Sequence, residues 1–153
     1  MSKFQPQRGT RDLLPDEQRK HQSIIDAARR VTRRFGLEQI ETPIFESTEV
    51  FARGLGEATD VVSKEMYTFP SRDGSASLTL RPENTAGVVR AFVSNGLANQ
   101  APVKHYYAGP MFRYERPQKG RYRQFHQIGV ELIGQGQPQA DIETIAAGHM
   151  VLA

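Results

Sequence analysis

Cysteine and tryptophan are both absent from the 153 residues of this chain. Without cysteine the chain can form no disulfide, no thiolate metal site and no cysteine nucleophile, which suits a reducing compartment. Long apolar runs are absent as well. None approaches the roughly 20 residues that cross a bilayer, and residues 1–11 lack the apolar segment of a secretory signal. We therefore expect a soluble cytoplasmic protein with no membrane partner.

A strong excess of charge of either sign is also missing. The 20 Lys and Arg residues and 17 Asp and Glu residues give a net charge of +3, which neither indicates nor excludes a nucleic-acid partner. Hydrophobic residues make up 38% and charged residues 24% of the chain, so the composition predicts a packed core. The length is that of one domain of roughly 100–200 residues, and no repeat or linker divides it.

Three segments have the apolar spacing of helices. Pro15 is typical of a first helical turn, and Asp16 and Glu17 suit the positive end of the helix dipole. The first helix is therefore predicted to begin at Pro15 and to stop at Gly36. A second helix is predicted from Pro82 to near Gly96, and a third from Asp141 to the last residue. The expected apolar positions are Ile24, Ile25, Ala28, Val31 and Phe35 in the first helix, Ala86, Val89, Phe92 and Val93 in the second, and Ile142, Ile145, Ala146 and Met150 in the third.

Strand signals lie between these helices. Asp73-Gly74 is a turn signal between two strand-like runs and predicts a β-hairpin, whereas Gly54 and Gly56 indicate backbone flexibility rather than a phosphate loop. Hairpins dominate and strands do not alternate with helices, so we expect an α+β fold with an antiparallel sheet flanked by helices. Strands are predicted at residues 37–44, 66–69, 77–80, 104–115 and 123–133, and residues 52–64 are predicted to be a loop.

The second hairpin, residues 104–115 and 123–133, carries most of the polar chemistry. Successive side chains on a strand point to opposite faces, so the mostly apolar even positions of the returning strand form a packed face. His126 belongs to it and is expected to be a core histidine rather than a catalytic one. The other face is predicted to gather a ring and a glycine among charged and amide side chains. These residues are Arg113, Glu115, Phe125, Gln127, Gly129 and Glu131.

An ordinary half-exposed sheet also displays charges on one face. Here, however, guanidinium and carboxylate groups are mixed, which suits a ligand with an anionic and a cationic end. Gly129 leaves room for a ligand to approach the backbone. The connecting loop has Arg116, Lys119 and Arg121 and no acidic residue. These features favour a binding site over a plain sheet surface.

Several segments of the sequence resemble one known family. The strings GPMFRYERP at 109–117 and GRYRQFHQ at 120–127 resemble motif 2 of class II aminoacyl-tRNA synthetases, and in detail the histidyl-tRNA synthetase family. TLRPENTA at 79–86 resembles the histidine-binding segment of that family, with Asn84 where a glycine is expected. Residues 15–43 resemble motif 1, and residues 8–12 resemble the usual opening. The resemblance covers essentially the whole chain.

The resemblance implies a histidine–tRNA ligase that uses ATP, accompanied by Mg²⁺, to activate histidine as histidyl-adenylate and then transfers it to tRNA(His). It also implies a homodimer formed through the motif 1 region. Arg113 is implied as the catalytic residue, since it would stabilise charge developing at the α-phosphate. No metal ligand is expected on the protein, because the histidines lack metal spacing. The implied binding residues are Arg113, Glu115, Arg121 and Phe125 for ATP; Glu83, Thr85, Arg113, Gln127 and Glu131 for histidine; and Arg116 and Gln118 for tRNA.

By this resemblance, residues 1–153 form the N-terminal portion of a class II catalytic domain, with motifs 1 and 2 and an incomplete C-terminal end. Motif 3 and the anticodon-binding domain are expected to be absent. The last helical pattern runs into Ala153 without a stop signal, which agrees with a piece of a longer protein. We therefore expect the isolated chain to be catalytically incomplete.

Two other functions remain open. The regulatory subunit of ATP phosphoribosyltransferase, a protein of histidine biosynthesis, resembles the synthetases but does not need the ATP and tRNA residues. The presence of Arg113, Glu115, Arg121 and Phe125 favours the synthetase. A plain RNA-binding module would need aromatic stacking platforms or a recognised RNA motif, and neither is evident.

Overall fold

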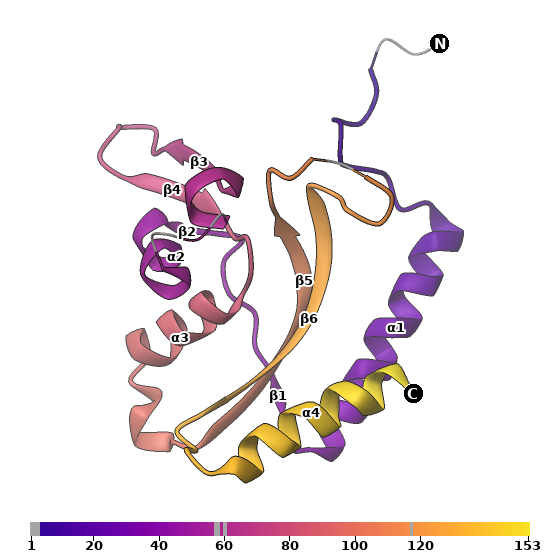
Figure 1. Ribbon diagram of the computed structural model, residues 1–153, viewed down its shortest axis with the longest axis vertical. Helices are drawn as coiled ribbons and strands as arrows, with labels where there is room; N and C mark the ends of the chain where they lie inside the picture. The colour runs from indigo at the N-terminus through magenta and orange to yellow at the C-terminus, as the bar shows by residue number, and fades with distance from the viewer. Residues whose placement is uncertain (1–3, 57–58, 60, 117) are drawn as a thin grey trace.

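The computed structural model of the chain describes residues 4–56, 59, 61–116 and 118–153. In Figure 1 the long β5–β6 hairpin runs through the middle of the molecule. Helices α1 and α4 lie on one side of it, and α2, α3 and a small sheet lie on the other. The elements of the described residues are α1 (Pro15–Arg34), β1 (Glu38–Gln39), β2 (Phe45–Ser47), α2 (Thr48–Leu55), the π-helical turn η1 (Val61–Glu65), β3 (Tyr67–Pro70), β4 (Ser77–Leu80), α3 (Thr85–Ser94), the 3₁₀ turn η2 (Leu97–Gln100), β5 (Val103–Phe112), β6 (Gln124–Ile133) and α4 (Pro138–Leu152).

The strands of the described residues form two three-stranded sheets. One has the order β1-β5-β6 and the other the order β2-β4-β3. Strand β6 pairs antiparallel with β5, with Met111 opposite Phe125 and Tyr107 opposite Gly129, whereas β1 pairs with β5 in parallel. The predicted α+β fold with hairpins and flanking helices is confirmed. The parallel pairing of β1 was not predicted.

Helix α1 follows the sequence signals at both ends, although Ile24 of its predicted apolar stripe is exposed. It begins at Pro15 with Asp16 and Glu17 in its first turn, and it ends at Arg34. Gly36 then takes a positive φ of 69°, a conformation in which glycine carries no steric cost. The predicted start and stop are therefore confirmed within two residues.

The buried faces of α3 and α4 differ from the predicted apolar stripes. In α3, which starts at Thr85 rather than at Pro82, the buried residues are Ala86, Gly87, Val88 and Ala91, whereas Val89 and Val93 are 46% and 71% exposed. Helix α4 starts at Pro138 and buries Ala140 and Ala147, whereas Ile142 and Ile145 are exposed. The small residues are buried because neighbouring elements approach closely. A Cβ on Gly54 of α2, for example, would lie 2.8 Å from the Cβ of Ala86.

Two of the predicted local structures are wrong. The predicted loop at 52–64 contains the end of α2 and the turn η1, and its residues 57, 58 and 60 lie outside the described residues. The predicted strand at 37–44 reduces to β1, because after Ile40 the chain leaves β5 and its next carbonyls bond to Arg81. Nη1 of Arg81 donates to the carbonyl of Thr42 over 2.9 Å, and its amide donates to the carbonyl of Ile44 over 2.9 Å.

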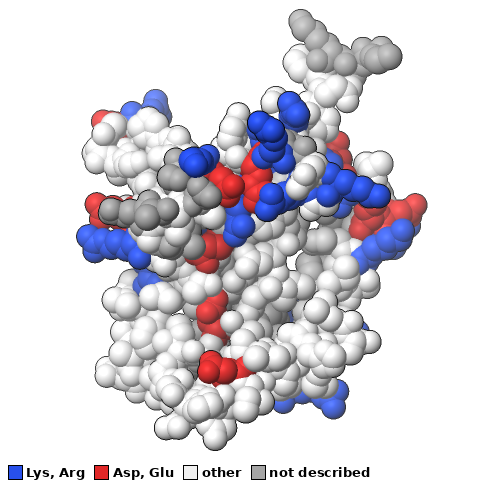
Figure 2. Space-filling model, in the orientation of Figure 1, with Lys and Arg blue, Asp and Glu red and all other residues white. Residues whose placement is uncertain are grey.

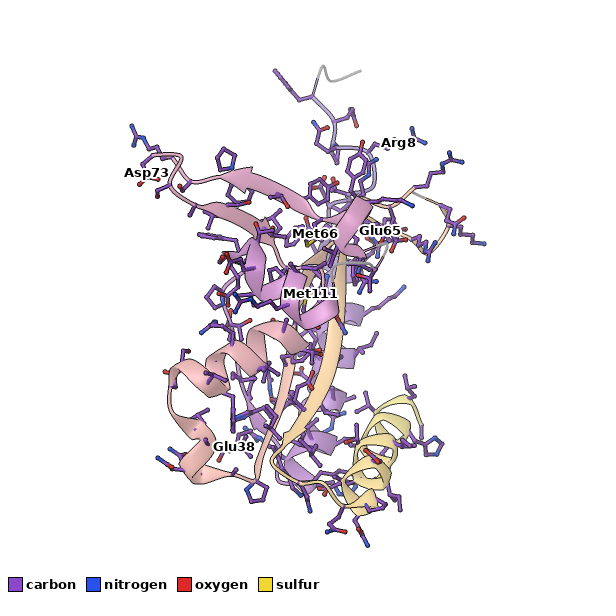
Figure 3. The ribbon with its side chains drawn as sticks, turned by 60° about the vertical axis from the view of Figure 1, so that its left-hand side comes forward. Arg8, Glu38, Glu65, Met66, Asp73 and Met111 are labelled. Carbon is purple, nitrogen blue, oxygen red and sulfur yellow. The ribbon has the colours of Figure 1, made fainter. Side chains whose placement is uncertain are left out.

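The predicted hairpin around Asp73-Gly74 is confirmed as β3–β4. At its tip the Asp73 carboxylate accepts from the Ser75 amide over 3.1 Å and from the Ser71 hydroxyl over 2.6 Å. Figure 3 places Asp73 at this tip, far from Glu65 and Met66 at the loop end of the long hairpin.

The buried core lies between α3 and one face of the β5–β6 hairpin. Val88, Tyr107 and Met111 form its centre. Partly buried apolar residues surround this centre, namely Ile40, Phe125 and Ile133. Since Phe125 belongs to the polar face predicted from the sequence, the core and the candidate site share one face of the hairpin.

Candidate active site

Arg113 connects the end of β5 to the segment that precedes α3. Its Nε donates to the carbonyl of Pro82 over 2.8 Å, and its guanidinium carbon lies 5.3 Å from the centre of the Phe125 ring. A guanidinium over an aromatic face is attracted by the ring quadrupole. Arg113 is therefore held from two sides, with its side chain 29% exposed.

Glu115 lies between two guanidinium groups. Its Oε2 is 2.7 Å from Nε of Arg121, and its Oε1 is 4.0 Å from Nη1 of Arg113. The Glu115 side chain is only 11% exposed, and its buried Oε2 has no aligned hydrogen bond in the described part of the chain. The carboxylate is thus compensated by charge but retains the capacity to accept a hydrogen bond from a ligand.

Glu83 forms a cap at the N-terminus of α3. Its two carboxylate oxygens accept from the amides of Thr85 and Ala86, over 2.6 Å and 3.0 Å. Glu83 is 7% exposed, so these bonds and the positive end of the helix dipole stabilise a charge that burial would otherwise disfavour. Each oxygen retains a further lone pair for a ligand cation.

Glu131 is hydrogen-bonded to the same short segment at the start of α3. The Thr85 hydroxyl donates to its Oε1 over 2.7 Å. Burial raises the pKa of Glu131, while hydrogen bonds from Thr85 and Tyr107 act in the opposite direction and the charge of Glu83 adds to the rise. The two carboxylates and Thr85 therefore form one connected group on the face of the hairpin.

Gln127 lies on β6 between Phe125 and Gly129, opposite Gly109 of β5. Its side-chain Oε1 is buried and has no hydrogen-bond partner among the described residues. An unsatisfied buried acceptor costs free energy that a ligand donor would recover. Gln127 is therefore suited to accept a hydrogen bond from a bound ligand.

The space above Gly129 belongs to Tyr107 and not to a ligand. A Cβ at Gly129 would overlap the ring and hydroxyl of Tyr107, so the expectation that a ligand approaches the backbone here is wrong. Tyr107 is 4% exposed, and burial raises its pKa to about 12. The sequence reasoning missed Tyr107, although it shares its strand parity with Arg113, and that parity was the available signal.

Arg81 is a second residue that sequence reasoning missed. It is 4% exposed, and its Nε donates to the carbonyl of Pro110 over 2.9 Å. A Cβ at Gly109 would lie 2.5 Å from its Nη2, so this glycine makes room for the guanidinium. Together with its bonds to Thr42, Arg81 joins β4, β5 and the segment after β1 behind the candidate site.

The loop of the long hairpin is exposed and basic. Arg116, Gln118 and Lys119 are all exposed, and Figure 2 shows Lys and Arg side chains gathered at this end of the molecule. The Arg121 amide donates to the Gln118 carbonyl over 2.8 Å, and Gly120 has a φ of 80°, so these residues form a tight turn. Residue 117 of the predicted tRNA loop lies outside the described residues.

Arg123 anchors the returning strand, and the sequence reasoning missed it too. Its amide donates to the Gly9 carbonyl over 2.7 Å, and its Nε donates to the Glu115 carbonyl over 3.2 Å. Its guanidinium carbon lies 4.0 Å from the centre of the Tyr114 ring. Arg123 thus fixes the backbone on which Glu115 is presented.

His126 lies on the opposite face of the hairpin. Its ring centre is 4.2 Å from that of His21 in α1, but the residue is exposed, so the expectation of a core histidine is wrong. The part of the ring that packs against α1 loses solvent, and this partial burial and, to a smaller degree, His21 lower the pKa of His126.

Two kinds of feature are absent from the residues that the structure describes. No helix there is long and apolar enough to cross a membrane. No three or more His, Asp or Glu side chains there gather as a metal ion would require. A groove of about 880 Å³ does run along α2 and α3, and Glu83 and Thr85 are among the residues that line it.

The geometry divides the predicted site into three parts. Arg113, Glu115, Arg121 and Phe125 meet at the loop end of the hairpin, through the contacts given above. Glu83, Thr85 and Glu131 are joined by hydrogen bonds further along the same face, and Gln127 lies between the two groups on β6. Arg116 and Gln118 are exposed on the turn, where the backbone of Gln118 pairs with that of Arg121. One face therefore offers two guanidinium groups around the Glu115 carboxylate at one end, and the carboxylates of Glu83 and Glu131 at the other.

Comparison with known proteins identifies the fold and the family. The family model described as Histidyl-tRNA synthetase matches residues 9–153. Among solved structures, the chain is similar to apo histidyl-tRNA synthetase from S. aureus, with 39% identity and a TM-score of 0.80 over 97% of this chain and 34% of that one. It is also similar to a Bacillus halodurans protein described as an ATP phosphoribosyltransferase regulatory subunit/histidyl-tRNA synthetase, with 29% identity and a TM-score of 0.84 over 99% of this chain and 38% of that one. The fold is therefore that of an aminoacyl-tRNA synthetase.

Curated relatives show which family of aminoacyl-tRNA synthetases the chain belongs to. Over 152 residues, 99% of the chain, it is 64% identical to a histidine–tRNA ligase from Rhodospirillum rubrum and 61% identical to one from Gluconacetobacter diazotrophicus. This chain belongs to the histidyl-tRNA synthetase family. It spans 36% of the length of each of these two relatives.

Proposed function

We propose that the protein carrying this chain is a histidine–tRNA ligase that activates histidine with ATP and transfers it to tRNA(His). The observation that carries the proposal is the single face of the β5–β6 hairpin on which Arg113 is held at one end and the Glu131–Thr85 pair at the other. Such a face suits a reaction that joins an anionic nucleotide to an amino acid with an ammonium group.

In the proposed activation step, a carboxylate oxygen of histidine attacks the α-phosphorus of ATP, and the bond to the leaving pyrophosphate breaks. Arg113 stabilises the charge that develops on the α-phosphate oxygens, and its contacts with Pro82 and Phe125 hold it ready. Catalysis of this kind is mainly positioning and electrostatics.

The other three proposed ATP-binding residues, Glu115, Arg121 and Phe125, position the nucleotide. Phe125 stacks on the adenine ring, and Glu115 accepts a hydrogen bond from the adenine amino group, a role supported by its buried oxygen without an aligned donor. Arg121, which is 63% exposed, reaches the outer phosphates. Mg²⁺ arrives with ATP and neutralises phosphate charge, and no residue of this chain is assigned as its ligand.

Histidine is held at the carboxylate end of the site. Glu83 and Glu131 face its cationic groups, Thr85 orients Glu131, and Gln127 accepts a hydrogen bond through its unsatisfied oxygen. A buried ammonium without a partner costs several kcal/mol, which is why two carboxylates are suitable here.

The acceptor end of tRNA meets the exposed turn in this proposal. A Gln side chain can both donate to and accept from a base edge, and an Arg side chain donates through two parallel groups. Gln118 and Arg116 are exposed and therefore available for such contacts. Transfer then follows as a hydroxyl of the terminal ribose attacks the activated carbonyl and AMP leaves.

The assembly is part of the same proposal. Residues 1–153 form the N-terminal portion of the class II catalytic domain with motifs 1 and 2, and the rest of the relatives' length holds motif 3 and the anticodon-binding domain. The protein works in the cytoplasm as a homodimer through the motif 1 region. Sedimentation of the full-length protein tests the dimer, and a monomer at all working concentrations contradicts it.

A regulatory subunit of ATP phosphoribosyltransferase is less well supported. The curated relatives compared above are named as ligases, and the four ATP-group residues would have no purpose in a protein that does not activate an amino acid.

Pyrophosphate exchange separates the two functions. The full-length protein is expected to exchange pyrophosphate into ATP when histidine is present and not with other amino acids. A regulatory subunit shows no histidine-dependent exchange, and that result overturns the proposal. The 153-residue chain alone is expected to show none, because it corresponds to about a third of the relatives' length.

A further inference from the structure

We propose that Tyr107 is a positioning residue that holds the Glu131 carboxylate toward the bound amino acid, so that recognition of a side chain with cationic or hydrogen-bond-donor character depends on the Tyr107 hydroxyl. The inference rests on the proposed function, since it assigns a purpose to a residue beside the proposed histidine site. Tyr107 itself acts through Glu131.

The position of Tyr107 follows from the strand register. Tyr107 lies opposite Gly129 in the β5–β6 ladder, and its ring and hydroxyl fill the space that a side chain at position 129 would take. Glu131 is two residues further along β6 and therefore on the same face. The absent side chain at Gly129 thus lets the phenol lie across β6 toward Glu131.

Three elements converge on the Glu131 carboxyl group. Thr85, at the start of α3, donates to it over 2.7 Å. The Tyr107 hydroxyl of β5 lies over Gly129, and the Tyr107 phenol and the Glu131 carboxyl each shift the pKa of the other. Tyr107 is 4% exposed and packs against Val88 and Met111 in the core. Because a core side chain has little freedom to move, it is suited to fix the direction of a neighbouring carboxylate.

The charged surroundings explain why the carboxylate needs support. Burial raises the pKa of Glu131, and Glu83 raises it further, whereas the hydrogen bonds with Thr85 and Tyr107 lower it. On β5, His105 lies opposite Glu131. The Lys104–Glu143 ion pair joins α4 to the hairpin. Lys104 is adjacent to His105 on β5 and therefore points to the other face of the sheet. Loss of the phenol hydroxyl therefore favours the protonated form of Glu131, which binds a cation less well.

Tyr106 provides a matched control. It is also 4% exposed, but it points to the other face, where its hydroxyl donates to Oε1 of Gln39 over 3.0 Å. Tyr106→Phe and Tyr107→Phe thus remove the same buried group from adjacent positions on opposite faces of β5. Both variants are made in the full-length protein and assayed by histidine-dependent pyrophosphate exchange.

Tyr107→Phe is expected to raise the KM for histidine roughly tenfold, the order expected for a hydrogen bond to a charged group, with the KM for ATP unchanged. The acid limb of the pH profile of kcat/KM for histidine is expected to move to higher pH, since Glu131 then ionises less readily. Tyr106→Phe is expected to change neither quantity. An unchanged KM and acid limb in Tyr107→Phe overturns the inference.

A double variant tests whether Tyr107 acts through Glu131. In the Glu131→Gln background, Tyr107→Phe is expected to change the KM for histidine less than twofold, because the carboxylate that it positions is already gone. A full tenfold effect in that background would indicate a direct contact with histidine and overturn the positioning role. Absence of histidine-dependent exchange in the unaltered protein would instead reject the proposed function.

Discussion

The hydroxyl of Thr42 donates to Oδ1 of Asn84 over 2.6 Å and joins the segment after β1 to the start of α3. Both residues are buried, with Asn84 1% exposed. The backbone of Asn84 has a φ of −120°, which any residue can adopt, so this position needs no glycine. The asparagine that departs from the family pattern has instead formed a tertiary contact.

Asn84→Gly is therefore expected to lower the free energy of unfolding by about 1–3 kcal/mol, since it removes a buried hydrogen bond and leaves the Thr42 hydroxyl without this acceptor. Urea unfolding measures the change. Asn99→Gly, at an exposed position of η2, is the control, and its effect is expected to stay within about 0.5 kcal/mol. Equal effects of the two substitutions would show that the contact contributes nothing.

Gly129→Ala is expected to destabilise the protein by about 1–3 kcal/mol, the usual cost of overpacking a core. Its new methyl group would overlap Tyr107, which the surrounding core prevents from moving freely. Gly148→Ala in α4 is the opposite case, because a Cβ there meets nothing within 4 Å and alanine favours the helix. Thermal or urea unfolding of both variants checks the pair, and a loss of stability at Gly148 alone would refute this packing.

Arg113→Ala and Gln118→Ala are expected to affect different steps of the proposed reaction. Arg113→Ala removes the group that stabilises the developing phosphate charge, so histidine-dependent pyrophosphate exchange is expected to fall by about 10²-fold or more. Gln118→Ala is expected to leave exchange nearly unchanged and to slow transfer to tRNA. Single-turnover assays separate the two steps. If Gln118→Ala and Arg116→Ala both left charging unchanged, the exposed turn would have no role in tRNA recognition.

Glu131 is expected to make stability depend on pH. Burial raises its pKa above the ordinary value of 4.5, so just above that value the folded protein still holds a proton that the unfolded chain has released. The free energy of unfolding therefore falls as pH rises through this window and remains lower above it. Glu131→Gln has no such proton and is expected to be less pH-dependent and more stable at neutral pH.

Urea unfolding of both proteins from about pH 4 to pH 7 measures this difference. The difference in stability between Glu131→Gln and the unaltered protein is expected to grow as the pH rises. A difference that is constant across the range would mean that Glu131 titrates alike in the folded and unfolded states.

The sequence predicted the elements whose signals are local. Helix α1 has Pro15 and two acidic residues at its start, and the β3–β4 hairpin has Asp73-Gly74 at its turn. In each case, nearby residues mark where the element begins or turns. Strand parity likewise placed Gln127 and Glu131 on the same face as Phe125, as the register of β6 shows. These features depend on neighbouring residues in the chain, which sequence alone supplies.

Other features depended on contacts between distant segments. Val89 and Val93 were expected in the core, but the close approach of Gly54 to Ala86 turns the small residues of α3 inward. Gly129 was assigned to a ligand because nothing in its own strand reveals that Tyr107, from β5, fills the space above it. Arg81 was missed for the same reason, since its acceptors at Thr42 and Pro110 are remote in sequence.

Glu83 caps the N-terminus of α3 and also faces the proposed ligand. The first turn of α3 therefore cannot open while the ligand stays bound to Glu83. The amides of Thr85 and Ala86 cannot exchange with solvent hydrogen unless the Glu83 carboxylate lets them go, and a ligand bound to that carboxylate must then be released as well. Binding therefore stabilises the first turn of α3 by mass action. The exchange rates of these two amides therefore report whether the proposed histidine end of the site is occupied, and they can be measured without any chemical turnover.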